Sequence, residues 1–345
     1  MEYIHWLKRE RILILYNEPS PLASESEVGV LDEVEAVRAA LETLGINYEI
    51  KGVQSLGDVE GALRGTPGLV FNLVESFKED PLSYCLVPNI CESMGWAVTG
   101  SSTPALLKTT DKPLCKAILR AHGIPPPDWE LIKNGCAFRR LKKAREIILK
   151  PAAYHGSEGI DGEKNLISSP YLIEKVIQLA KELGEKFKFG IMAEEFVGDR
   201  EINVTVLEKD GFVEVLKLAE IDFSGLIQGY PRILDYKAKW DQGSYIHQLT
   251  PRIIPAPLSN GISEEIRRIA LRCSEVFSCN DYMRVDFRLK GKRIYVIDVN
   301  TNPDVSLNGG LAAAIHASGI SYETFVLQVL VNAYKRHRSK LAHWI

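Results

Sequence analysis

Long hydrophobic runs, closely spaced cysteine pairs and basic tracts are all missing from this sequence of 345 residues. The apolar run at 12–15 is too short for the core of a signal sequence or for a membrane span, so we expect no membrane association. The six cysteines include no C-x-x-C pair, which favours reduced thiols in the cytoplasm over disulfides or a zinc site. The net charge is −3 and no basic run contains aromatic residues, which argues against a nucleic-acid-binding protein.

The composition is that of a globular protein with two or three domains, because 46% of the residues are hydrophobic and 25% are charged. In the first hundred residues expected strands alternate with expected helices, at 11–16, 29–44, 48–53, 69–73, 83–93 and 96–99. This alternation predicts a parallel, doubly wound sheet. Three consecutive prolines at 125–127 mark a boundary. Further strands are expected beyond it, at 145–150, 190–196, 202–208 and 212–219.

The stretch RVDFRLKGKRIYVIDVN at 284–300 combines two strand patterns with polar residues that an ordinary dry sheet would not contain. Arg284, Asp286, Asp298 and Asn300 are the polar residues in question. Carboxylate and amide oxygens are ligands for hard cations such as magnesium. The pattern therefore predicts a metal site, and the alternative is a solvated sheet face on which Asp298 only pairs with Arg284.

The metal site depends on the register of this hairpin. A three-residue loop at 290–292 would place Arg284 opposite Asp298. Asp286 and Asp298 would then be diagonal neighbours on one face, with Cβ atoms about 7–8 Å apart. A two-residue loop would turn Asp298 to the other face.

Three lysines are candidates for binding phosphate. Lys150 ends an expected strand and precedes PAAYHGSEGI, whose glycines can expose backbone N–H groups. Lys239 lies in DYKAKW, inside a long irregular stretch that is typical of a lid. Lys112 follows Asp111 at a helix start, where helix capping alone explains the aspartate. Each lysine also has an ordinary explanation as a surface residue, and the G-K-[ST] of a Walker A loop is absent.

Acidic residues end another expected strand, in EEFVGDREINV. Glu194 or Glu195 could accept a hydrogen bond from an adenine amino group, while the backbone of Phe196 and Val197 reads the edge of the ring. Glu201 could bind ribose hydroxyls. The alternative is an acidic strand end that is simply solvated.

Five stretches in this order resemble the ATP-grasp superfamily, and within it the D-alanine–D-alanine ligases. They are TTDKPLCKAILRAHGIPPPDW, IILKPAAYHGSEGI, MAEEFVGDREINV, DYKAKW and RVDFRLKGKRIYVIDVNTNP. The resemblance implies an α/β fold with an N-terminal doubly wound parallel sheet and two subdomains whose antiparallel sheets clasp ATP. The expected domains are 1–105, 106–200 and 201–345.

The resemblance also implies a nucleotide site with divided roles. ATP phosphates would contact Lys112 and Lys150, and Lys239 would reach the γ-phosphate from the lid. Adenine would contact Glu194, Glu195, Phe196 and Val197, and ribose would contact Glu201.

The implied reaction joins a carboxylate to an amine through an acyl phosphate. Asp286, Asp298 and Asn300 would hold two magnesium ions, with manganese as an alternative, and Arg284 would stabilise the tetrahedral oxyanion. Lysines and metal would neutralise the charge that develops on phosphate. A closed lid would keep water from the acyl phosphate.

Several positions depart from the family pattern on the substrate side. The family usually has glutamate at Asp298 and tyrosine at Trp240, and its phosphate-loop serine pair is reduced to Gly156-Ser157 here. The Ser-Leu pair that grips the second D-alanine carboxylate falls on Gly309-Gly310.

The N-terminal segment departs as well. NLVESFKED replaces the usual HG-x-x-GEDG segment, and SESEV resembles the stretch whose glutamate, here Glu25, orients the first amine. We therefore expect Glu25, Ser157, Lys239 and Arg284 at the reacting groups and Trp240, Gly309 and Gly310 at the substrates.

Two hypotheses from different classes follow. The first is a ligase for small carboxylates and amines, with D-alanine as both substrates or with a different amino-acid or small-acid pair. The second is a nucleotide-binding regulator without turnover, which the retained lysines and carboxylates argue against. His155 or His247 would act only on an unusual acceptor. By analogy with related ligases, we expect a homodimer.

Overall fold

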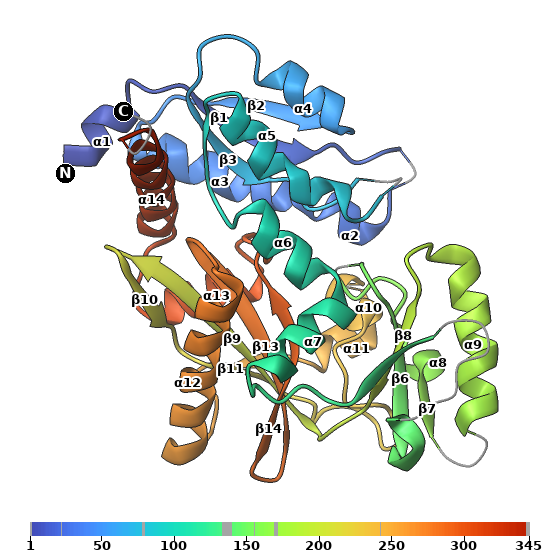
Figure 1. Cartoon of the computed structure of the whole chain (residues 1–345). Coiled ribbons are helices and arrows are strands. Elements are labelled where there is room, and N and C mark those ends of the chain that lie inside the picture. Colours follow the sequence, from blue (N-terminus) through green and yellow to red (C-terminus); the bar gives the residue numbers. More distant parts are fainter. Residues whose placement is uncertain are drawn as a thin grey trace.

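The computed structural model describes residues 2–21, 23–77, 80–132, 140–154, 156–168, 172–241 and 243–342. Their strands form three sheets, each with its own helices (Figure 1). The expected α/β fold, with one parallel sheet followed by two antiparallel sheets, is confirmed. Within the described residues, no helix is both long and apolar enough to cross a membrane.

The first sheet is parallel and has the strand order β2 (Glu49–Val53), β1 (Ile12–Asn17), β3 (Leu69–Leu73), β4 (Ala97–Val98). Alternate residues of β1 point to opposite faces and enter two separate cores. Ile12 and Ile14 pack with helices α3 (Val30–Leu44) and α14 (Tyr322–Ala342). Leu13 and Leu15 pack with α4 (Leu56–Ala62) and α5 (Val87–Ser93). Helices therefore cover both faces, as expected for a doubly wound sheet, and α14 returns from the C-terminal end to complete one of them.

The second sheet is antiparallel, with the order β5 (Trp129–Ile132), β8 (Ile191–Glu195), β6 (Glu146–Pro151), β7 (Leu166–Ser168). Helix α9 (Leu172–Lys186) covers one face through Val176 and Ala180, which are buried against Ile147 and Leu149. Between β6 and β7 the chain forms a turn and the short helix α8 (Gly162–Asn165).

The third sheet has the order β12 (Arg252–Ile253), β11 (Ala219–Ile221), β9 (Arg200–Lys209), β13 (Tyr282–Lys290), β14 (Arg293–Asn300), and β10 (Phe212–Val215) also pairs with β9. The apolar residues Val285, Phe287 and Leu289 of β13 pack against α12 (Asn260–Phe277) and α7 (Lys112–Ala121). The intervening polar residues of β13 consequently face away from this core.

The register expected for the β13–β14 hairpin is wrong, although its polar face is correct. Lys290 pairs with Arg293, so the loop has two residues rather than three. A β-bulge follows, because Phe287 pairs with Val296 while Asp286 pairs with Asp298, which leaves Ile297 as the extra residue. The two-residue loop alone would turn Asp298 to the other face of the sheet, and the extra residue of the bulge returns it to the face of Asp286. Asp286 and Asp298 are therefore directly opposed rather than diagonal.

Two other expectations need correction. The helix expected at 110–122 is α7, which begins only at Lys112 because the Asp111 side chain caps it by accepting from the Leu114 N–H at 2.9 Å, and the helix α6 (Thr103–Thr110) before it was not expected. The irregular stretch expected at 224–260 contains helices α10 (Tyr236–Trp240) and α11 (Tyr245–Gln248) as well as β12.

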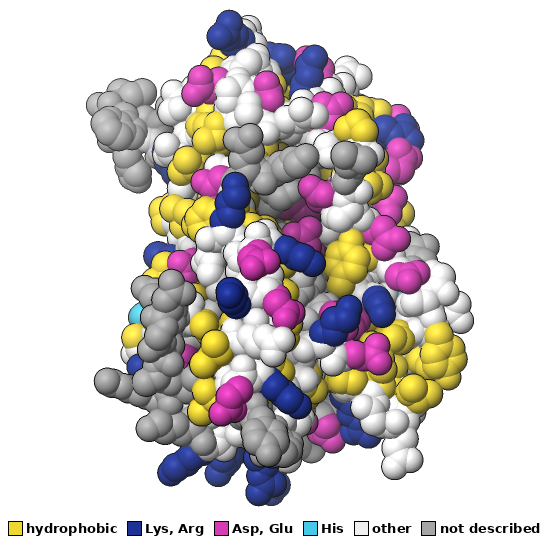
Figure 2. All heavy atoms as spheres, turned by 90° about the vertical axis from the view of Figure 1, so that its right-hand side faces the viewer, with side chains coloured by type: hydrophobic (Ala, Val, Ile, Leu, Met, Phe, Trp, Pro, Cys, Tyr) yellow, Lys and Arg dark blue, Asp and Glu magenta, His cyan; other side chains and the backbone are white. Residues whose placement is uncertain are grey.

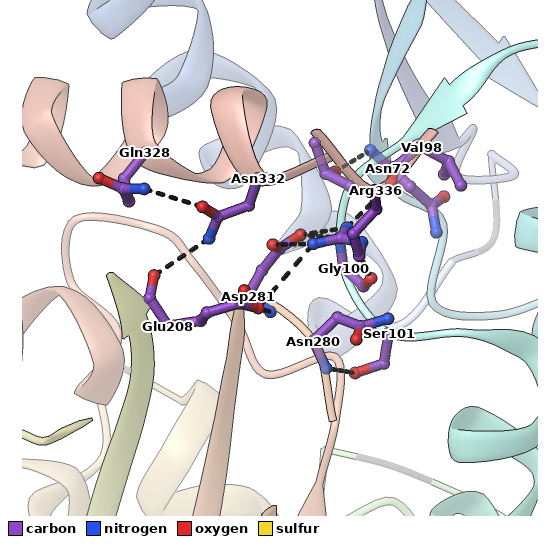
Figure 3. A network of polar contacts seen from close by, with 11 residues as sticks. Asn72, Val98, Gly100, Ser101, Glu208, Asn280, Asp281, Gln328, Asn332 and Arg336 are labelled. Carbon is purple, nitrogen blue, oxygen red and sulfur yellow. Dashed lines mark hydrogen bonds and ion pairs between the residues drawn. The ribbon is translucent and has the colours of Figure 1, made fainter. Parts of the chain in front are cut away.

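A buried polar network joins the N-terminal sheet to the start of β13 (Figure 3). The Asp281 side chain is fully buried and accepts from Arg336 of α14, with Nη2 2.9 Å from Oδ2. The same carboxylate accepts from the Gly100 N–H at 2.6 Å. Arg336 also donates to the Val98 carbonyl at 3.2 Å, and Asn332 donates to the Glu208 carbonyl at 3.1 Å. These contacts fix the beginning of β13, three residues before Arg284, relative to the first sheet.

Candidate active site

A cavity of about 1300 Å³ lies between the two antiparallel sheets and is closed by the N-terminal segment and α10. Its lining includes nearly every residue expected at the site: Glu25, Lys112, Lys150, Ser157, Glu194, Glu195, Phe196, Val197, Glu201, Lys239, Trp240, Arg284, Asp286, Asp298, Asn300 and Gly310. Gly309 is not part of this lining. On one outer face of the molecule, acidic and basic side chains of the described residues are interspersed (Figure 2).

The floor of the cavity is the polar face of β13 and β14. Arg284 and Asp286 form a two-point ion pair, with Nε–Oδ1 at 2.8 Å and Nη2–Oδ2 at 3.0 Å. Asn203 of β9 also donates to Asp286, at 2.8 Å. Burial lowers the pKa of Arg284, but the facing Asp286 carboxylate outweighs it and raises the pKa above the ordinary value. The partner of Arg284 is therefore Asp286, whereas the alternative considered from the sequence paired it with Asp298.

A cluster of lysines forms one wall. Lys150 of β6 lies 2.7 Å from Glu194 of β8, and Lys116 of α7 contacts the other carboxylate oxygen. Burial raises the pKa of Glu194, but the two lysines outweigh it and lower the pKa below the ordinary value. Lys112 donates to the Tyr154 carbonyl, and burial lowers its pKa. Lysines held at fixed positions suit a ligand with several negative charges.

The adjacent wall is organised by Arg288, which is only 3% exposed. Its guanidinium donates to the carbonyls of Val197 at 2.9 Å and Gly198 at 3.0 Å. It also lies 3.2 Å from Glu201 and 4.4 Å from the centre of the Phe196 ring. Burial raises the pKa of Glu201. Arg288 therefore fixes the loop after β8 and leaves an apolar ring beside a carboxylate.

Helix α10 lies closed over the turn after β6. Its capping residue, Asp235, is fully buried and accepts from the Gly162 N–H at 2.9 Å. The Trp240 indole donates to the Gly156 carbonyl at 2.8 Å, and Ser157, which has a φ of 62°, donates to the Leu234 carbonyl at 3.2 Å. Lys239 is part of the cavity lining, where burial and the charge of Arg284 lower its pKa. Helix α10 and its neighbours thus cover this side of the cavity, at the place that the sequence prediction gives to a lid, and we call them the lid.

The N-terminal segment contacts the lid and the turn through Ser26, the neighbour of Glu25. Ser26 donates to Glu158 at 2.9 Å, and its N–H donates to the Tyr236 hydroxyl at 3.3 Å. Glu25 is exposed at the rim of the cavity. His155 lies outside the described residues, and the His247 ring contacts the Ala238 carbonyl at 2.8 Å.

Several carboxylates influence one another on the side of the cavity near the first sheet. Burial, together with the charges of Asp304 and Glu158, raises the pKa of Glu75 to about 8. Glu33, which accepts from the Val305 N–H at 3.2 Å, has a pKa raised well above its ordinary value by burial and by Glu75. This part of the cavity lies where NLVESFKED departs from the family pattern.

A side chain at Gly309 would displace a charged group, whereas a Cβ at Gly310 would only reach contact distance of one. A Cβ at Gly309 would lie 2.8 Å from the Asp304 carboxylate, and a Cβ at Gly310 would lie 3.5 Å from Arg252 Nε. Asp304 thus occupies the space that a side chain at 309 would need, and a side chain at 310 longer than a methyl group would extend against Arg252.

Sequence reasoning missed Lys116, Arg288 and Arg252. A signal existed for the first two, because Lys116 follows Lys112 by one helical turn and Arg288 continues the alternation of Arg284 and Asp286. Arg252 had no such signal, since it reaches the cavity only through the pairing of Ile221 with Arg252 at the edge of the third sheet.

The oxygen atoms of the floor suit a magnesium ion that is only partly coordinated by protein, rather than a metal whose ligands all come from the protein. Among the described residues no three acidic, histidine or cysteine side chains converge on one point. Two opposed carboxylates with a nearby amide, Asn300, match the magnesium sites in which phosphate oxygens and water complete the shell.

Comparison with known proteins identifies the family. The family model for the D-Ala D-Ala ligase C-terminus matches residues 118–331, more than half of the chain. The D-alanine–D-alanine ligase of Bordetella avium is 26% identical over 328 residues, covering 94% of each chain. That of Ralstonia pickettii is 24% identical over 318 residues, covering 90% of this chain and 88% of that protein.

A solved structure has the same fold. The D-alanine–D-alanine ligase of Bacillus anthracis complexed with ATP superimposes with a TM-score of 0.74, covering 96% of this chain and 99% of that one at 19% identity. Together with the family match, this shows that the chain belongs to the D-alanine–D-alanine ligase family and is an ATP-dependent carboxylate–amine ligase.

Proposed function

We propose that this enzyme joins two amino acids, with D-alanine as the first candidate for both, and that the cavity described above is its active site. The observation that carries the proposal is the convergence of Arg284, Asp286 and Asp298 with Lys150 and Lys239 in one cavity. Cationic groups facing a carboxylate floor suit the transfer of a phosphoryl group.

The nucleotide would lie between the two antiparallel sheets. Lys112 and Lys150 would contact its phosphates, and Lys239 would reach the terminal phosphate from the lid. Adenine would lie along Glu194 to Val197, beside the Phe196 ring, and Glu201 would contact ribose. Because Glu194 is held between Lys116 and Lys150, it would also fix the position of Lys150.

Asp286, Asp298 and Asn300 would hold magnesium. When bound, the metal would neutralise charge on the phosphate oxygens. Arg284 would hold the Asp286 carboxylate in a fixed orientation through its two-point contact.

In the first step, a carboxylate oxygen of the first substrate attacks the terminal phosphorus of ATP. An O–P bond forms, the bond to the bridging oxygen breaks, and ADP leaves with that electron pair. In the second step, the amine of the second substrate attacks the acyl carbon, the C–O bond to phosphate breaks, and phosphate leaves while the amine loses a proton. Arg284 would donate to the oxyanion formed in this step, and the closed lid would exclude water.

Two further features belong to the proposal. The requirement for ATP and the free cysteines of the described residues suit the cytoplasm. We also propose that the chain has an N-terminal domain at 1–105 and two further subdomains at 106–200 and 201–345. Two chains would form a homodimer through their N-terminal domains.

Positional isotope exchange tests the first step. ATP labelled with ¹⁸O at the β–γ bridge is incubated with enzyme, magnesium and D-alanine or another small amino acid. Reversible formation of the acyl phosphate should scramble the label. The absence of scrambling with every acid, in enzyme that binds ATP, would contradict the proposal. Loss of scrambling in Lys150→Met, but not in the exposed Lys292→Met, would locate the step in this cavity.

A further inference from the structure

Arg252 is a cationic group of the cavity that forms no ion pair with an acidic side chain of the described residues. It lines the cavity from the edge strand β12. Within the described ranges, no carboxylate lies within ion-pair distance of its guanidinium, whereas Arg284, in the same cavity, has Asp286. Desolvation and the charge of Arg284 lower the pKa of Arg252. The two guanidinium groups repel each other, and a nearby anion would stabilise each of them. Among the described residues Arg284 has such an anion, Asp286, whereas Arg252 has none at ion-pair distance.

The orientation of Arg252 leaves one edge of the guanidinium open. Nη1 donates to the Asn308 carbonyl at 3.1 Å, which fixes the plane of the group. The Nε and Nη2 atoms face Gly310 and lie 3.5 Å and 3.9 Å from the place where a Cβ would stand. These two atoms form the edge that binds carboxylates in a two-point contact, as the same edge of Arg284 does with Asp286.

Glycine at position 310 is what keeps this edge uncovered. A longer side chain there would lie against Nε and Nη2 and exclude a ligand. Among the described residues Asp304 forms no ion pair with Arg252, although its charge and that of Asp286 oppose the lowering of the Arg252 pKa, and its Oδ1 accepts from the Ser306 N–H at 2.7 Å. The arrangement therefore combines a fixed guanidinium, an open edge and access to the cavity.

We propose that Arg252 binds the carboxylate of the second substrate and thereby restricts that substrate to amines that carry a carboxylate. This inference rests on the proposed function, because it assigns the acceptor of the same reaction. Arg252 is then a specificity-determining residue, and Gly310 is required because it leaves the binding edge free.

The test separates acceptor recognition from formation of the acyl phosphate. Hydroxylamine, a small amine without a carboxylate, traps acyl phosphates as hydroxamates. Each enzyme is given ATP, magnesium and D-alanine, glycine or L-alanine, with either hydroxylamine or a second amino acid as the acceptor. The measured quantity is the ratio of dipeptide formation to hydroxamate formation.

We expect this ratio to fall about 10- to 100-fold in Arg252→Met, as for loss of a charge-assisted two-point contact. Arg252→Lys should give a smaller fall because it keeps the charge but not the fork. Gly310→Leu should lower the ratio similarly with Arg252 intact, so the test does not depend on one variant folding. Amino-acid carboxamides as acceptors should show no such fall.

Two matched controls should leave the ratio unchanged. Arg293→Met removes an exposed arginine of the β13–β14 hairpin, and Gly261→Leu alters a glycine at the start of α12 that has open space around it. An unchanged ratio in both Arg252→Met and Gly310→Leu would overturn the inference. The inference would also be overturned if the wild type formed hydroxamate but no dipeptide with any amino-acid acceptor. The absence of hydroxamate with every acid would instead contradict the proposed function.

Discussion

The indole of Trp240 lies directly against the backbone of Gly29, at the start of α3. A Cβ at Gly29 would stand 2.6 Å from Cζ3 of the indole, so no side chain fits there while the lid is closed. The same indole donates to the Gly156 carbonyl at 2.8 Å. One lid residue therefore contacts both the N-terminal segment and the turn after β6, although it lacks the hydroxyl of the tyrosine that the family usually has.

This contact predicts that Gly29→Ala will disturb lid closure. The φ of Gly29 is −54°, which alanine accepts, so the effect must come from the collision with Trp240. We expect kcat/KM to fall about 10-fold, as for strain of roughly 1–2 kcal/mol in a packed contact. The control is Gly184→Ala, a glycine inside α9 with open space around it. Equal activity of both variants would show that the closed lid is not the active state.

The opposed carboxylates of the floor predict a strong effect of Asp286→Asn. The variant keeps the shape of the side chain but loses the charge of the ligand that we propose for magnesium and the ion pair with Arg284. We expect turnover to fall about 100-fold or more and the magnesium concentration for half-maximal activity to rise. The control is Asp199→Asn, an exposed partner of Arg232. Unchanged activity and unchanged magnesium dependence in Asp286→Asn would refute the metal assignment.

The buried network of Figure 3 predicts a large loss of stability in Asp281→Asn. Asparagine tolerates the φ of 59° at this position, so the change removes the charge without straining the backbone. Leaving Arg336 without its carboxylate should cost about 3 kcal/mol in the free energy of unfolding, measured in urea. Arg268→Met breaks an exposed ion pair with Glu265 and should leave the free energy of unfolding nearly unchanged, because solvent screens this pair. A similar cost for both changes would mean that the network does not join the sheets.

The carboxylates near the first sheet predict a pH dependence of stability. The pKa of Glu75 is about 8 in the folded protein, so between its unfolded value of 4.5 and pH 8 the folded state holds a proton that the unfolded chain has lost. Stability should therefore fall as the pH rises through this range. Glu75→Gln removes this dependence, and its stability relative to wild type should increase from pH 5 to pH 8 in thermal unfolding. A difference that stays constant with pH would contradict the raised pKa.

Local patterns explain which parts of the site could be predicted from the sequence. Arg284, Asp286 and Asp298 were found because polar residues alternated with apolar ones, and a strand gives this alternation a direct geometric meaning. The bulge at Ile297 could not be predicted in the same way. A bulge adds one residue without a characteristic sequence, so the loop length and the final register were wrong even though the facing residues were right.

Contacts between distant segments were the part that the sequence did not contain. Arg252 meets Gly310 because the edge strand β12 lies beside the start of α13 (Gly310–Ala317), whereas Asp304 meets Gly309 within the loop that precedes this helix. The glycine pair alone gave no indication of which charged groups occupy the space of the missing side chains. Similarly, Ser26, the neighbour of the predicted Glu25, connects the N-terminal segment to Glu158, and this contact depends on how the first sheet is placed over the lid.

The most direct test of the central claim is the measurement of phosphate release, with mass spectrometry of the products, from ATP and magnesium with D-alanine, L-amino acids and hydroxy acids, singly and in pairs. The account predicts stoichiometric phosphate and a condensation product that requires two amino acids, with D-alanyl-D-alanine as the first candidate. A product from another amino-acid pair alone would keep the ligase reaction and replace D-alanine as substrate. ATP binding without phosphate release or product from any pair would contradict the account.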